Sequence, residues 1–179
     1  MSLVVSIVGR SNSGKTTLLE KLIAELKRRG YTVAAVKHSG SDFQLDHPGK
    51  DSWRLAQAGS DAVLLASPTR LAFVQKASRP PSLQDVIDFL GNGYDFILVE
   101  GFKGSSVPKI EVHRRDAGQL MTSPDKLLAV VTDERLDVAV PQFSKSDGMA
   151  LADLLEKSLR ERSCAGIAPA DGRSPWSCD

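Results

Sequence analysis

The sequence has few cysteines and few aromatic residues. Of its 179 residues only two are cysteines, Cys164 and Cys178, and both lie near the end of the chain. No CxxC pair is present, and a disulfide between the two would close only the C-terminal tail. This usage favours a cytoplasmic protein whose thiols have no structural role.

The charges nearly cancel, with 23 basic against 22 acidic residues and a formal net charge of +1. This balance gives no electrostatic sign of binding to nucleic acid or to an anionic membrane. No apolar stretch approaches the roughly 20 residues of a membrane-spanning helix. The first residues also lack the basic segment of a secretory signal. We therefore expect a cytoplasmic protein with no nucleic-acid and no membrane partner.

The apolar pattern predicts one α/β domain over residues 1–162, followed by a tail over residues 163–179 that is rich in Gly, Pro, Ser and Ala. Alternation of Ile110 and Val112 with Glu111 and His113 indicates a half-exposed strand. The other expected strands are 4–8, 32–36, 62–65, 71–75, 96–99 and 127–131, and the expected helices are 15–29, 53–58, 82–90 and 147–159.

Two features predict how the strands are arranged. The strand, helix and strand within residues 4–36 form a βαβ unit, which implies a parallel sheet with a right-handed crossover. Residues 62–65 and 71–75 are separated only by a turn around Pro68, so they can pair only antiparallel. We expect them to form a hairpin at an edge of the sheet. Asp51 or Ser52 is the expected cap of the helix between these regions, and Ser82 that of the next helix.

The strongest motif follows the first expected strand. The segment Gly9–Thr16 fits G-x-x-x-x-G-K-[ST] and precedes an expected helix, as a P-loop must. Its glycines let the backbone wrap a phosphate, Lys15 adds a positive charge, and the Thr16 hydroxyl can bind Mg²⁺. The residues expected to contact the phosphates are Gly9, Ser11, Asn12, Ser13, Gly14, Lys15, Thr16 and Thr17. The fold class predicted is a three-layer α/β P-loop NTPase with a mostly parallel central sheet and an edge β-hairpin.

A P-loop needs a second acidic group for its metal. Glu100 ends the apolar strand Phe96–Val99 and precedes Gly101, so its carboxylate should emerge beside the phosphates. The alternative is an ordinary surface glutamate at the end of a strand. We expect Thr16 and Glu100 to be the metal ligands.

Other candidates for ligand contacts are more ambiguous. Lys37 and His38 end the second strand, and Asp51 and Arg54 follow the long polar loop after it. Charges this dense either bind an anionic ligand or form a solvated surface. Asp133 follows the strand 127–131, where its carboxylate either accepts N1–H and N2–H of guanine or caps a turn. The Asn-Lys-x-Asp signature of many GTPases is absent.

Taken together these segments resemble MobB, a family of nucleotide-binding proteins associated with the synthesis of molybdopterin guanine dinucleotide. The resemblance covers about residues 4–155 and leaves out the tail. It is carried by segments 8–18, 36–38 with 48–54 and 58–59, 99–103 and 108–112.

This resemblance implies a GTP-binding protein with weak Mg²⁺-dependent GTPase activity. It implies an adaptor that acts beside the MobA-like guanylyltransferase that joins GMP to molybdopterin. It also implies a homodimer, to which the 71–75 strand contributes. Molybdopterin is a candidate second ligand, and a preference for GTP over ATP rests on the resemblance alone. The residues that it places around the pocket are Lys37, His38, Asp51, Arg54 and Lys103.

Slow hydrolysis is expected because no Gln or Arg is clearly placed to orient water or to neutralise the transition state. Arg10, inside the loop, is the nearby cation that could assist Lys15 in catalysis. The alternative function is a P-loop small-molecule kinase, whose lid would need Arg114 and Arg115 within a helical hairpin. A partitioning ATPase is disfavoured because the loop lacks a second early basic residue.

Overall fold

The computed structural model describes residues 2–42, 46–115 and 118–165. The chain divides into two compact units, one made of Met1–His38 with Ile87–Asp179 and the other of Ser39–Val86. Most of the predicted tail lies outside the described residues.

The first unit is built on a six-stranded sheet in the order β2-β5-β1-β6-β7-β8, in which every neighbouring pair is parallel. The predicted α/β class with a mainly parallel central sheet is thus confirmed. The two-residue strand β8 has no counterpart in the prediction. The bounds are β1 (Leu3–Val8), β2 (Val33–Lys37), β5 (Phe96–Glu100), β6 (Lys109–Val112), β7 (Leu127–Val131) and β8 (Gln142–Phe143).

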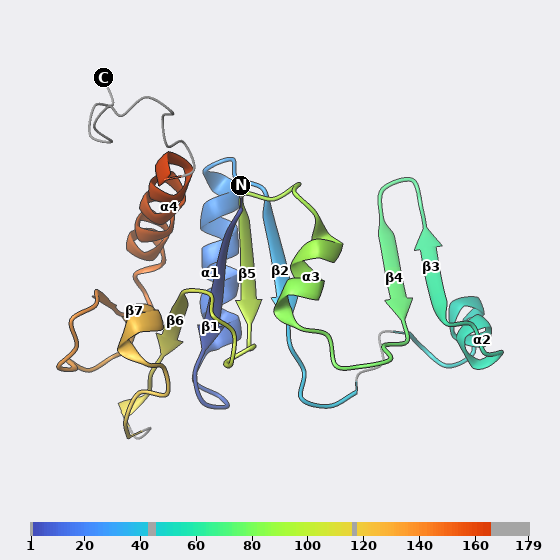
Figure 1. The fold of residues 1–179 in the computed structure, drawn as a ribbon, viewed down its shortest axis with the longest axis horizontal. Helices are drawn as coiled ribbons and strands as arrows, with labels where there is room; N and C mark the ends of the chain where they lie inside the picture. The colour runs from blue at the N-terminus through green and yellow to red at the C-terminus, as the bar shows by residue number, and fades with distance from the viewer. Residues whose placement is uncertain (1, 43–45, 116–117, 166–179) are drawn as a thin grey trace. The chain divides into compact units, whose positions relative to one another are not determined.

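Helices α1 (Lys15–Arg28) and α4 (Gly148–Ala165) pack against each other and against β1 (Figure 1). Their fully buried leucines, Leu22 and Leu26 on α1 with Leu151 and Leu155 on α4, join the apolar side chains of β1 and β5 in one core. Helix α4 runs beyond the predicted 147–159, so the predicted boundary at residues 162 and 163 falls inside it.

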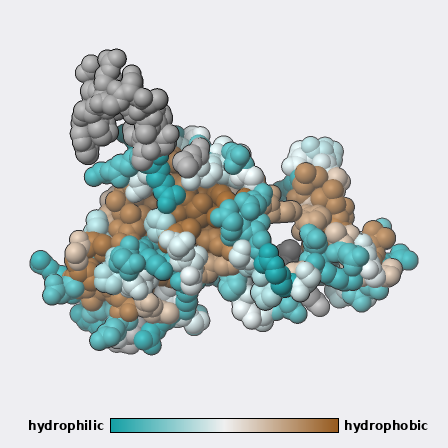
Figure 2. All heavy atoms as spheres, in the orientation of Figure 1, coloured by the Kyte–Doolittle hydropathy of each residue, from teal (hydrophilic) through white to brown (hydrophobic). Residues whose placement is uncertain are grey.

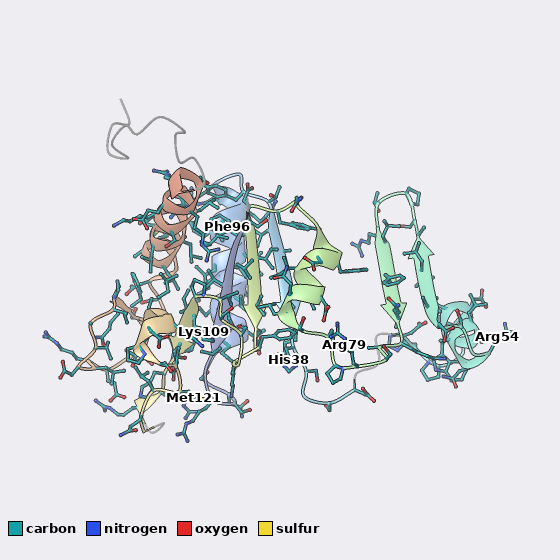
Figure 3. All side chains as sticks on the ribbon, in the orientation of Figure 1. His38, Arg54, Arg79, Phe96, Lys109 and Met121 are labelled. Atoms are coloured by element: carbon teal, nitrogen blue, oxygen red, sulfur yellow. The ribbon has the colours of Figure 1, made fainter. Side chains whose placement is uncertain are left out.

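The strand β6 is buried over its whole length, and the expectation of a half-exposed strand is wrong. Both Glu111 carboxylate oxygens accept backbone N–H groups of the loop at Met121 and Thr122. Lys109 donates to the carbonyl oxygens of Ser105 and Val107 (Figure 3). The polar side chains of this strand therefore anchor long loops and do not face solvent, because those backbone groups replace water as partners.

The second unit contains α2 (Asp51–Gln57) and an antiparallel hairpin of β3 (Ala62–Ala66) and β4 (Leu71–Gln75). The hairpin is confirmed, but its expected place at an edge of the central sheet is wrong, because it forms a separate two-stranded sheet. The expected cap of α2 is also wrong: Asp51 is the first helical residue and Lys50 precedes it without a side-chain cap.

Helix α3 (Leu83–Leu90) begins as predicted. The Ser82 hydroxyl accepts the Asp85 N–H at 3.2 Å, and the Asp85 carboxylate accepts the Ser82 N–H at 2.8 Å. Each side chain thus satisfies a backbone donor that the first turn of the helix leaves free.

Candidate nucleotide-binding site

The segment between β1 and α1 forms a tight loop whose backbone only glycine can follow at two points. Gly9 has φ +148° and Gly14 has φ +98°. A Cβ atom at Gly9 would lie 2.5 Å from the carbonyl oxygen of Val112 and 2.8 Å from the Ser13 hydroxyl. The loop is therefore pressed against the end of β6, and α1 begins directly after Gly14.

This loop and the start of α1 carry several hydrogen-bond donors that a phosphate could accept. The N–H groups in the first turn of α1 have no acceptor within the helix and carry its positive dipole end. The Ser13 hydroxyl is buried, with no hydrogen-bond partner among the described residues. The Lys15 ammonium donates to the carbonyl oxygen of Arg10 at 2.7 Å, so it lies across the loop. This set of donors fits a polyphosphate.

Glu100 lies beside the loop as predicted, because β5 is the neighbour of β1 and Glu100 pairs in register with Ile7. Its Oε2 accepts the Thr16 hydroxyl at 2.9 Å, and its Oε1 forms an ion pair with Lys37 at the end of β2. A hydroxyl and a carboxylate are hard oxygen donors that fit Mg²⁺, with phosphate oxygens and water completing the coordination.

Burial and the neighbouring charged and polar groups shift the pKa values of Glu100 and Lys15. Burial alone would raise the pKa of Glu100, but the hydrogen bonds from Lys37 and Thr16 outweigh it and lower that pKa below its ordinary value. Burial lowers the pKa of Lys15, and the neighbouring Lys103 and Lys37 lower it further against the opposing effect of Glu100. Glu100 is thus held as the carboxylate that a metal requires.

The backbone after Glu100 takes an unusual path. Gly101 has φ +109° and Phe102, a residue with a side chain, has φ +50°. A Cβ atom at Gly101 would lie 2.8 Å from the His38 Cβ, and the His38 and Phe102 rings lie 4.4 Å apart between centroids. Glycine takes a positive φ freely, but at Phe102 this conformation costs about 1–3 kcal/mol and is of a kind that clusters at functional sites.

The remaining predicted residues fall in different places. Lys103 and Arg10 are exposed in the first unit. Asp51 and Arg54 belong to α2 of the second unit, and Arg54 is labelled there in Figure 3. Their part in the same pocket stays a prediction. Asp133 is bound to Lys145, which the sequence analysis did not single out.

A hollow of about 410 Å³ adjoins the loop on the side away from Glu100. Lys21 and Lys145 line this hollow, and the sequence did not predict either as a site residue. Arg114 lines it too, but the sequence suggested it only as part of the lid of a kinase. The signal for Lys145 was weak, since the strand β8 that precedes it has only two residues. The full lining is Asn12, Ser13, Gly14, Thr17, Leu18, Lys21, Arg114 and Lys145.

Within residues 2–42, 46–115 and 118–165, no cluster of three or more His, Cys, Asp or Glu side chains could hold a metal by itself. Over the same part of the chain, no helix is long and apolar enough to cross a membrane.

A parallel α/β sheet with a G-x-x-x-x-G-K-T loop between its first strand and first helix defines a P-loop fold. The family model of MobB, molybdopterin guanine dinucleotide synthesis protein B, matches residues 4–133. The chain belongs to this family.

Similar proteins agree with this assignment. The chain is 40% identical over 162 residues to a molybdopterin-guanine dinucleotide biosynthesis adapter protein of Haemophilus influenzae, covering 87% of this chain and 89% of that one. It is 34% identical to the Escherichia coli protein of the same description, covering 85% and 90%. A solved structure of a molybdopterin-guanine biosynthesis protein B aligns with a TM-score of 0.70 and 32% identity, covering 88% of this chain and 99% of that one.

Proposed function

We propose that this chain binds GTP with Mg²⁺ at the Gly9–Thr16 loop and acts as an adaptor in the synthesis of molybdopterin guanine dinucleotide. The observation that carries the proposal is the pairing of that loop with Glu100, whose carboxylate accepts the Thr16 hydroxyl. Membership of the MobB family supports the adaptor role. GTP as the ligand is consistent with a pathway that includes a guanylyl transfer. We expect the protein to act in the cytoplasm.

The adaptor's partner is a guanylyltransferase that joins GMP to molybdopterin. Binding is measured by sedimentation velocity with GTP and Mg²⁺, with GDP, and without nucleotide. A complex in at least one state supports the adaptor role. Separate sedimentation in all three states contradicts it, whatever the affinity for GTP.

Hydrolysis is expected to be slow, on the order of 10⁻³ s⁻¹ or below, as in P-loop proteins that lack a partner's arginine. Arg10 and Lys15 are the cations that the loop segment itself carries. The alternative, a small-molecule kinase, finds little support in Arg114 and Arg115, which follow β6 with no helical hairpin around them in the part of the chain that the structure describes. Rapid release of GDP that depends on a small alcohol or acid would favour the kinase.

We also propose that the chain forms a homodimer through the second unit. Apolar side chains are exposed on both faces of the β3–β4 hairpin, among them Leu64 and Leu71 on one face and Leu65 and Val74 on the other. Brown hydrophobic surface covers much of the hairpin in Figure 2. A two-stranded sheet with two apolar faces is not stable in water by itself, so a second copy is its natural cover.

A further inference from the structure

Two buried polar side chains lie on the face of the central sheet opposite the core that α1 and α4 cover. Ser6 on β1 and Lys109 on β6 are register partners, so their side chains point to the same face. Ser6 is fully buried and Lys109 is 2% exposed. A buried polar group is unfavourable unless hydrogen bonds replace its contacts with water. Both side chains have such partners, and the partners lie in one loop, residues 101–108.

Ser6 is hydrogen-bonded to the turn directly after Glu100. Its hydroxyl donates to the carbonyl oxygen of Gly101, and the Gly101 N–H donates to the Ile7 carbonyl oxygen at 3.2 Å. The Gly101 carbonyl belongs to the peptide plane that joins Gly101 to Phe102. Rotation of this plane would change ψ of Gly101 and φ of Phe102. The hydroxyl therefore stabilises Phe102 at φ +50°, which is unfavourable for a residue with a side chain.

Lys109 holds the same loop further along. Its ammonium donates to the carbonyl oxygens of Ser105 and Val107. The Ser105 N–H in turn donates to the Phe102 carbonyl oxygen at 2.9 Å. The loop is thus fixed near its start by Ser6 and near its end by Lys109.

Phe102 contacts the end of β2. Its ring lies 4.4 Å from the His38 ring between centroids. The His38 N–H donates to the Glu100 carbonyl oxygen at 2.9 Å, and Lys37 forms the ion pair with the Glu100 carboxylate. The place of Phe102 therefore affects the end of β2, and through it the carboxylate that accepts the Thr16 hydroxyl.

These contacts form one path from the buried strands to the carboxylate beside the phosphate loop. Resting on the Mg²⁺-dependent nucleotide binding proposed above, we propose that Ser6 and Lys109 are positioning residues of the Glu100 site. They fix the loop 101–108 so that the Glu100 carboxylate keeps its direction toward Thr16. Groups that orient a metal ligand raise the affinity for the metal, because the ligand reorganises less on binding.

Burial alone would not select these two residues. Val4 and Val8, the other side chains of β1 on this face that are buried, are apolar. An ammonium is costly to bury, and burial lowers the pKa of Lys109. A serine and a lysine at these positions are therefore explained by the loop conformation that they hold.

The first test compares Ser6→Ala with Val4→Ala. Ser6→Ala removes the hydroxyl and little volume, whereas Val4→Ala removes apolar volume from the same face. GTP affinity is measured by calorimetry with and without Mg²⁺. We expect Ser6→Ala to lower the strengthening of GTP binding by Mg²⁺ about 2- to 10-fold, as for the loss of one hydrogen bond, without changing the affinity in the absence of Mg²⁺. Val4→Ala should lower the melting temperature and leave the strengthening by Mg²⁺ unchanged.

Lys109→Met is the second variant. It retains an unbranched stem and loses both hydrogen bonds to the loop, so it should reduce the effect of Mg²⁺ as Ser6→Ala does. If Lys109→Met does not fold, Ser6→Ala decides the proposal alone.

A second measurement needs no nucleotide. The chain has three histidines, so the ring-proton NMR signals of His38 can be assigned by their loss in His38→Gln. The Phe102 ring should displace these signals from their position in an exposed histidine. This displacement should shrink in Ser6→Ala and persist in Val4→Ala.

The outcomes separate the two proposals. If the wild type binds no GTP, the proposed function fails. If the wild type binds GTP more tightly with Mg²⁺, but Ser6→Ala changes neither this effect nor the His38 signals, the positioning inference fails and the phosphate site stands. Equal loss of the Mg²⁺ effect in Ser6→Ala and Val4→Ala would also overturn the inference, because it would indicate a general loss of packing.

Discussion

Gly9 is a residue at which the phosphate loop packs tightly against the end of β6. An alanine at this position would be unfavourable for two reasons. Its backbone would have to adopt φ +148°, and its Cβ atom would lie 2.5 Å from the carbonyl oxygen of Val112. We expect Gly9→Ala to lower the free energy of unfolding by about 1–3 kcal/mol and to weaken nucleotide binding, since the loop must shift.

The control for this change is Gly93→Ala. A Cβ atom there meets nothing within 4 Å. In thermal unfolding, the melting temperature of Gly93→Ala should be close to that of the wild type. Equal melting temperatures of Gly9→Ala and Gly93→Ala would contradict the close packing of the loop.

At this scale the sequence was a good guide to the phosphate loop and to Glu100. The loop motif is local, and Glu100 follows a strongly apolar strand, so its place at the sheet edge could be inferred. The ion pair of Glu100 with Lys37 depends on the register of β2 and β5 and could not be inferred. The burial of Glu111 was missed because its partners, Met121 and Thr122, lie about ten residues away in a loop without periodicity.

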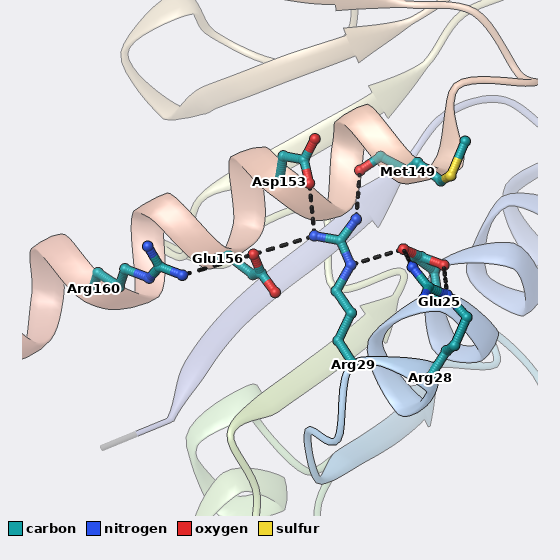
Figure 4. Close-up of polar contacts among 7 residues, drawn as sticks. All are labelled: Glu25, Arg28, Arg29, Met149, Asp153, Glu156 and Arg160. Carbon is teal, nitrogen blue, oxygen red and sulfur yellow. Dashed lines mark hydrogen bonds and ion pairs between the residues drawn. The ribbon is translucent and has the colours of Figure 1, made fainter.

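Between elements, Arg29 links the two helices that cover the sheet (Figure 4). Its guanidinium donates to Glu25 at 2.7 Å, to Asp153 at 2.6 Å and to the Met149 carbonyl oxygen at 3.2 Å. Loss of hydrogen bonds to charged groups costs about 1.5–3 kcal/mol, and we expect Arg29→Ala to lower the unfolding free energy by that amount in urea.

The matched control is Arg28→Ala. Arg28 pairs with the same Glu25 carboxylate, but its side chain is 68% exposed, against 16% for Arg29. Exposed pairs contribute little. Equal losses in the two variants would contradict a structural link specific to Arg29.

The same network predicts a pH dependence. Hydrogen bonds from Arg28 and Arg29 lower the pKa of Glu25 from 4.5 to about 2. A carboxylate with a lowered pKa in the folded state stabilises the fold above its unfolded pKa, and this contribution is lost as the pH falls toward the folded pKa. The difference in melting temperature between wild type and Glu25→Gln should therefore shrink between pH 4.5 and pH 2, and a constant difference would contradict it.

The elements themselves followed the sequence where apolar residues are continuous or recur at helical spacing. Strands β1, β5 and β7 and helix α1 lie where the pattern predicts them. The sequence pattern could not show β8, whose two residues carry no period, nor that the hairpin forms its own sheet, because strand pairing is decided by long-range contacts.

For the whole molecule, the exposed hairpin is the feature that a dimer would explain. Leu71 on β4 is 73% exposed. A charge at this position would have to be desolvated in a dimer interface, and we expect Leu71→Glu to shift the sedimentation coefficient toward the monomer.

The control is Met149→Glu on α4, which is 67% exposed in the other unit. It should sediment as the wild type does. A wild-type chain that is monomeric at all concentrations would contradict the proposed dimer and leave the nucleotide site untouched.

The most direct test of the account is calorimetric titration of the wild type, Lys15→Ala and Glu100→Gln with GTP, with and without Mg²⁺. The account predicts that the wild type binds GTP and that Mg²⁺ strengthens this binding. Lys15→Ala should lose the binding, and Glu100→Gln should lose at least about tenfold of the strengthening by Mg²⁺. Absence of GTP binding by the wild type, or binding that neither substitution alters, would contradict the assignment of this site.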